Sequence, residues 1–116
     1  MEFAVSRDGT TLVTLHEGTD TTARDEATDE LTARLESIAA DGTISAFEIT
    51  DATVYEHPAA PFDPYTITVE FTVEVVVEAA DDADAEELGA TAIAEALETA
   101  EVGSISYTSS PAVTAD

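Results

Sequence analysis

The sequence predicts an α+β domain of ferredoxin-like order, β-α-β-β-α-β, a two-layer sandwich in which two helices cover one face of an antiparallel sheet. Three observations lead to this prediction: a long stretch of strict alternation, two segments of helical periodicity, and a weak internal repeat. The chain of 116 residues is long enough to bury a core as a single domain, 1–116.

The alternating stretch runs from Tyr65 to Ala79. Its odd-numbered positions are apolar or aromatic, and its even-numbered positions are threonine or glutamate except at Val76. A period of two built from β-branched residues predicts a strand with one buried and one solvated face. Such a strand would be about 50 Å long, whereas a compact domain of this size is about 35 Å across. We therefore expect the strand either to bend or to pair with a second chain, and we predict a homodimer.

The first helical segment extends from Thr22 to Ala40 and is closed by Gly42. Its apolar residues recur every three or four positions, so one stripe faces a core. That stripe consists of Ala23, Ala27, Leu31, Leu35 and Ile38.

The second helical segment begins at a cluster of acidic caps and reaches about Ala100. The caps are Asp81, Asp82 and Asp84. The predicted apolar face comprises Leu88, Ala92, Ile93, Ala96 and Leu97, with Gly89 alongside to allow a close approach to the sheet.

The remaining segments are extended. Around the turn signal Arg7-Asp8-Gly9, residues 2–17 predict a hairpin or bent strand, which we take as an extra N-terminal strand. Residues 43–57 change apolar parity near Asp51, which predicts a β-bulge there. A short strand at 104–108 follows the second helix, and beyond Pro111 we expect an edge strand or a loose tail.

Residues 17–46 and 78–107 share the same order of acid, acidic cap, helix, glycine and short strand. The repeat divides the chain into halves 10–57 and 65–114, joined by the proline-rich connection 58–64.

Charge is the strongest compositional signal. The chain has 26 aspartates and glutamates, three arginines, no lysine and no cysteine, for a net charge of -23. Because such a chain repels itself unless salt screens it, the composition predicts a halophilic protein. The absence of cysteine excludes disulfides and thiolate metal sites. Because the sequence contains neither a membrane-spanning apolar run nor a signal-peptide pattern, we expect a cytoplasmic protein without membrane contact.

Several residues are candidate site residues. Gly18, Thr19 and Asp20 lie between the first strand and first helix, where ferredoxin-like regulatory domains of the ACT type bind small effectors at a dimer interface; the similarity is one of topology. Phe62 and Tyr65 belong to the stiff loop Pro58–Tyr65 and are candidates for a recognition surface.

Two further groups have simpler explanations. The acids at 81–87 lack the spacing of a calcium loop and suit a helix N-terminus. His16 and His57 are the two imidazoles, and neither sits in a catalytic motif. We therefore expect no metal and no cofactor. We also expect no nucleic acid, because Phe71 lacks the aromatic partners of an RNA-binding sheet.

These features favour a non-enzymatic role: a small self-associating interaction module without a catalytic site. The alternative is a regulatory domain of ACT-like topology with a small-molecule ligand at the dimer seam.

Overall fold

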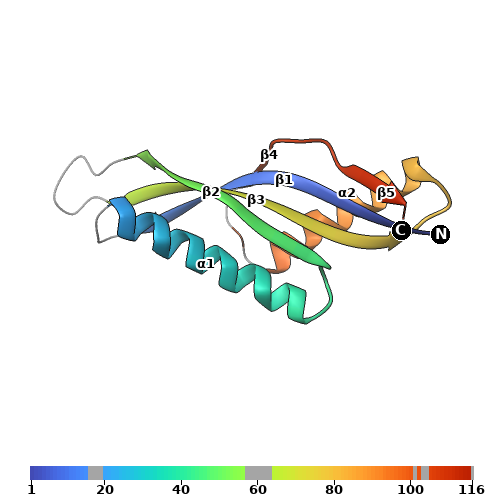
Figure 1. The fold of residues 1–116 in the computed structure, drawn as a ribbon, viewed down its shortest axis with the longest axis horizontal. Helices are drawn as coiled ribbons and strands as arrows, with labels where there is room; N and C mark the ends of the chain where they lie inside the picture. Colours follow the sequence, from blue (N-terminus) through green and yellow to red (C-terminus); the bar gives the residue numbers. More distant parts are fainter. Residues whose placement is uncertain (16–19, 57–63, 101, 103–104, 116) are drawn as a thin grey trace.

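The computed structural model describes residues 1–15, 20–56, 64–100, 102 and 105–115. These residues form an α+β structure with an antiparallel sheet of five strands and two helices (Figure 1). In chain order the elements are β1 (Glu2–Leu15), α1 (Asp20–Ala40), β2 (Ala46–Glu56), β3 (Tyr65–Glu78), α2 (Asp82–Thr99), β4 (Ile105–Tyr107) and β5 (Ala112–Ala115).

The centre of the sheet is the pair β1–β3, which is antiparallel and in continuous register from Glu2 opposite Glu78 to Leu15 opposite Tyr65. The predicted parity of β3 is confirmed, because its central odd-numbered side chains are buried. Directly opposite residues of an antiparallel pair share a face, so the odd-numbered residues of β1 point to the same side. The buried members from these two strands are Phe3, Val5, Ile67, Val69, Phe71, Val73 and Val75.

The strand order is β2-β3-β1-β4, and β5 pairs with β1 beyond β4. β2 pairs antiparallel with β3 through a register shift between Ile49 and Asp51, which confirms the predicted bulge. A second shift lies between Val54 and Glu56.

β1 lies inside the sheet between β3 and β4, so the prediction of an extra N-terminal strand was wrong, and so was the hairpin, one of the two alternatives for residues 2–17. Residues 2–15 form one strand, and Arg7-Asp8-Gly9 pairs with β3 like its neighbours. Gly9 serves packing instead of a turn: a Cβ there would lie 3.1 Å from Cζ of Phe71, so the missing side chain makes room for that ring. The segment after Pro111 is the strand β5.

The molecule is elongated, with principal extents of 55 × 25 × 19 Å, and the helices are staggered along its length (Figure 1). The expectation of a compact shape was wrong, so the length of β3 alone gives no reason to expect either a bend or a second chain. β3 keeps its full length because β1 pairs along one side and β2 along most of the other.

α1 lies over β2 and β3 at one end of the sheet, and its predicted apolar stripe is fully buried. The helix ends as predicted at Gly42, whose φ of 82° is easily adopted only by glycine. The N–H of Thr43 donates to the carbonyl of Ile38 at 3.0 Å, which closes a Schellman motif.

α2 lies over β1 and β3 toward the other end. The carboxylate of Asp81 accepts from the N–H of Asp84 at 2.9 Å, which confirms the predicted N-cap. Leu88, however, is 48% exposed, so its assignment to the core face was wrong. The close seating of Gly89 rotates the helix so that Leu88 points away from the sheet, and the buried residues are Ala85, Gly89, Ile93, Ala96 and Leu97.

Candidate functional site

The last four residues of β1 form the longest stretch of that strand whose outer edge no described strand covers, and Glu2 and Arg7–Asp8 are the shorter ones. β4 pairs with β1 at Gly9 to Thr11 and β5 pairs at Phe3 to Ser6, whereas β3 occupies the other side along the full length. Within the described residues, the backbone groups of Leu12–Leu15 on this side have no strand partner. This edge is also free of acidic side chains from Gly9 to Leu15.

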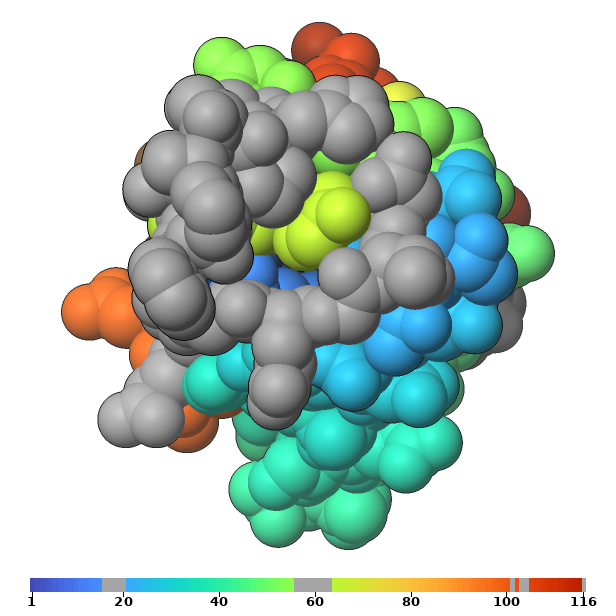
Figure 2. Space-filling view, turned by 90° about the vertical axis from the view of Figure 1, so that its left-hand side faces the viewer, coloured from blue at the N-terminus to red at the C-terminus, as the bar shows by residue number. Residues whose placement is uncertain are grey.

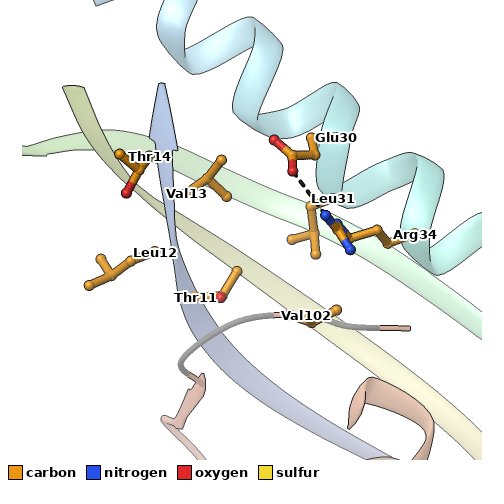
Figure 3. A pocket seen from close by; sticks show the side chains of 8 residues that line it. All are labelled: Thr11, Leu12, Val13, Thr14, Glu30, Leu31, Arg34 and Val102. Carbon is orange, nitrogen blue, oxygen red and sulfur yellow. Dashed lines mark hydrogen bonds and ion pairs between the residues drawn. The ribbon is translucent and has the colours of Figure 1, made fainter. Parts of the chain in front are cut away.

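Beside this edge lies a cleft of about 210 Å³ between β1, α1 and the segment after α2 (Figure 3). Val13 and Leu31 contribute apolar walls, and Thr11 is a polar residue of the lining that is only 2% exposed. The described lining consists of Thr11, Leu12, Val13, Thr14, Glu30, Leu31, Arg34 and Val102. Figure 2 looks onto this end of the molecule, where parts of β1 and β3 are visible next to the first turns of α1.

Arg34 ties the two helices together at the rim of the cleft. One guanidinium nitrogen (Nη1) donates to the carbonyl of Ala100 at 3.2 Å, and the other (Nη2) donates to Oε1 of Glu30 at 3.1 Å. Ala100 is the C-cap of α2, and the last turn of α2 contains no basic residue. Arg34 therefore supplies from α1 the positive charge that stabilises the C-terminal carbonyls of α2.

Arg7 performs a similar task at the C-terminal segment. Its Nε–H donates to the carbonyl of Ser109 at 3.0 Å, and its guanidinium carbon lies 4.0 Å from the centroid of the Tyr107 ring. Burial raises the pKa of the Tyr107 phenol above its usual 10.0, and the charge of Arg7 offsets only part of that increase. Two of the three arginines thus hold segments of the chain together.

The sheet face opposite the helices divides into two ends. Toward the cleft it is mostly threonine: cross-strand rows place Thr53, Thr68 and Leu12 side by side, and Thr66 between Glu56 and Thr14. We call the uncharged residues Thr53, Thr68, Leu12, Thr66 and Thr14 the uncharged patch, and Glu56 borders it. Acidic residues occupy the other part of the face, at Glu2, Asp8, Glu48, Asp51, Glu70, Glu74 and Glu78. Exposed apolar residues occur at both ends: Leu12 is 41% exposed and Val76 is 44% exposed.

Most of the site residues predicted from sequence lie outside the described residues: Gly18, Thr19, Phe62, His16 and His57. Asp20 is the first residue of α1, and its side chain also lies outside the description. Tyr65 is the first residue of β3, opposite Leu15, and is partly buried against the core.

The acidic start of α2 acts as a helix cap, as described for Asp81. Among the described residues, no group of three or more histidine, aspartate or glutamate side chains is arranged to hold a metal ion. Nor does the described part contain a helix with the length and apolarity needed to cross a bilayer.

Sequence reasoning missed the cleft and its rim. Two signals pointed to it: the acid-free run from Gly9 to Leu15, and Arg34, a rare cation four residues after Glu30. Neither signal reveals that α1 comes to lie beside the edge of β1, because that contact depends on the stagger of the helices.

No protein-family model matches the chain, and no curated protein sequence matches it either. The functional assignment therefore depends on the geometry of the chain itself.

Proposed function

We propose that this protein is a small, salt-adapted interaction module that forms a homodimer by pairing strands. The observation that carries the proposal is the outer edge of β1 at Leu12–Leu15, which no described strand covers and which lies next to the cleft. Unpaired strand edges bind other strands readily, because their backbone donors and acceptors are already aligned.

The other long edge of the sheet, along β2, is less suited to pairing. β2 contains two register shifts and carries Glu48 and Asp51 as exposed side chains. Bulges and charges are the features by which natural proteins block edge-to-edge association. The edge of β1 at Leu12–Leu15 has neither.

Electrostatics favour the same location. At a net charge of -23, two copies repel each other over most of their surfaces. Burying unpaired charges is costly, and the uncharged patch with the acid-free edge beside it contains fewer carboxylates than the rest of the face, with Glu30 at the cleft and Glu56 beside Thr66.

Gel filtration with light scattering in about 2 M KCl, where surface charges are screened, tests the proposal. We expect a dimer for the wild type and a monomer for Leu12→Glu, which places a charge at the edge. Val76→Glu is the matched control, since Val76 lies on the same sheet face with similar exposure but at the far end. A monomeric wild type, or a dimer that Val76→Glu breaks and Leu12→Glu leaves intact, would overturn the proposal.

The alternative is a regulatory domain of ACT-like topology. It is favoured by the cleft at the end of β1, which is lined by Glu30, Leu31 and Arg34 from the middle of α1. A thermal-shift screen with amino acids and nucleotides tests it, because a ligand at 100 times its dissociation constant stabilises the folded state by about 2.7 kcal/mol. A screen without any shift in the wild type would count against this alternative.

We further propose that the topology is ferredoxin-like. The support is the antiparallel order β2-β3-β1-β4, with one helix between β1 and β2 and the other between β3 and β4. Relative to the ferredoxin-like arrangement, this protein has an additional strand, β5, and helices that are staggered along the length of the sheet.

A further inference from the structure

We infer a small-molecule site in the groove between α2 and the segment that joins β4 to β5, with an α-amino acid of small aliphatic side chain as its ligand. The groove has a volume of about 420 Å³, and its described lining consists of Arg7, Ala83, Glu86, Glu87, Ala90 and Pro111. It shares no described lining residue with the cleft beside β1, so the inference goes beyond the proposed self-association and does not depend on it.

Arg7 is the cation of this groove, and the fold holds its side chain while leaving its terminal nitrogens available. Its Nε–H donates to the carbonyl of Ser109 at 3.0 Å, and its guanidinium lies over the ring of Tyr107. The N–H of Asp8 donates to the hydroxyl of Ser109 at 3.0 Å, which ties Ser109 to β1. Among the described residues, neither Nη1 nor Nη2 has a hydrogen-bond partner or an ion pair. Two N–H donors held at a fixed separation match the two oxygens of a carboxylate.

Glu86 and Glu87 supply the opposite charge from α2. Both are exposed residues that line the groove, and within the described part of the chain neither forms an ion pair with Arg7 or with another cation. An ammonium group beside them would find acceptors in their carboxylates. Because the arginine and the glutamates line the same groove without contacting one another, one ligand can bind both charges at once.

This arrangement disfavours a ligand with a single charge. A simple anion is attracted by Arg7 and repelled by the two glutamates, and a simple cation experiences the reverse. A zwitterion with its carboxylate at Arg7 and its ammonium at Glu86 or Glu87 gains both attractions. The remaining described lining is two alanines and a proline, which suits a small aliphatic side chain.

Three ligands that differ by one charged group test the inference. They are valine, isovalerate, which lacks the ammonium of valine, and isobutylamine, which lacks its carboxylate. Each is titrated in about 1 M KCl, where long-range charge effects are screened. Calorimetry gives the affinities, and the nuclear magnetic resonance signal of the Arg7 Nε–H locates the binding. That signal is assigned by its loss in Arg7→Gln, which is direct because the chain contains three arginines and no lysine.

We expect valine to shift the Arg7 signal and to bind more tightly than isovalerate or isobutylamine by about tenfold or more. Glu86→Gln combined with Glu87→Gln should weaken valine by a similar factor and strengthen isovalerate, because it removes the repulsion. Arg7→Gln should abolish the binding of both. Glu95→Gln and Arg24→Gln change the same charges at exposed positions outside the groove, so these controls should bind valine like the wild type.

If isovalerate binds the wild type as tightly as valine, the inferred recognition of a zwitterion is wrong. If valine leaves the Arg7 signal unchanged, or binds the double glutamine variant as tightly as the wild type, the site is not in this groove. The double variant retains every described contact of Arg7, so it decides the question even where Arg7→Gln fails to fold by circular dichroism. Light scattering tests the dimer separately, so either proposal can fail without the other.

Discussion

A Cβ atom added to Gly89 would lie 2.4 Å from Cγ1 of Val5 and 2.5 Å from its Cβ. Atoms do not approach this closely, so α2 reaches β1 only because residue 89 has no side chain. The same contact sets the rotation of α2: it buries Ile93 and Leu97 and leaves Leu88 exposed.

Gly89→Ala is therefore expected to destabilise the protein. In an exposed helix position alanine is better than glycine by about 1 kcal/mol, but overpacking a core costs about 1–3 kcal/mol. We expect the second effect to dominate, because the clash involves the Cβ of Val5 and cannot be relieved by a rotamer change. Denaturant unfolding in high salt measures it. Ala94→Gly, at an exposed position of α2, is the control and should show the ordinary preference for alanine. A gain in stability from Gly89→Ala would contradict the observed seating of α2.

Arg34→Ala should cost about 1 kcal/mol, the typical contribution of a favourable charge at a helix terminus. The variant removes the donor to Ala100 and leaves α2 without a cation at its C-terminal end. The free energy of unfolding gives the measurement, and Arg24→Ala provides the comparison, since Arg24 is an exposed arginine of the same helix. Equal effects of the two variants would argue against the bridging role of Arg34.

Glu70→Gln is expected to stabilise the protein in low salt. Asp51 lies directly opposite Glu70, and like charges in opposite positions of a sheet destabilise it by about 0.2–1 kcal/mol. Because salt screens this repulsion, the difference should shrink as KCl rises toward about 1 M. Melting temperatures over a KCl series test it. Glu48→Gln is the control, because the residue opposite Glu48 is Thr72. A benefit of Glu70→Gln that is independent of salt would point to another cause.

Tyr107 should make the fold sensitive to alkali. Burial raises the pKa of its phenol in the folded state above the usual 10.0. A group whose folded pKa is raised contributes stability that is fully present below its unfolded pKa and is lost as pH rises through the folded value. We therefore expect stability to fall above about pH 10, and Tyr107→Phe to weaken that fall. An unchanged pH profile for Tyr107→Phe would assign the alkaline loss to other groups.

Much of the fold was predictable because its signals are local. The alternation of β3 identified its buried face, the spacing in α1 identified its stripe, and the parity change near Asp51 located a bulge. Each of these depends on residues close in sequence. The turn signal Arg7-Asp8-Gly9 failed because β3 pairs with those residues and the ring of Phe71 fills the space above Gly9. Gly9 makes room for the ring of Phe71, which belongs to β3 and is distant in sequence.

The cleft and its edge show the same limit. The sequence contains the acid-free run of β1 and the isolated Arg34, but it does not show which elements these residues contact in the folded protein. By itself, the sequence determined the periodicities, the caps, the charge and the α+β class, because these follow from residue type and spacing. Only the tertiary structure decided that the molecule is elongated, that the helices are staggered, and that among the described residues β4 pairs with β1 from Gly9 to Thr11, next to the cleft beside α1. The physical reason is that such contacts are chosen by the global competition to bury apolar surface and pair backbone groups, which no local pattern encodes.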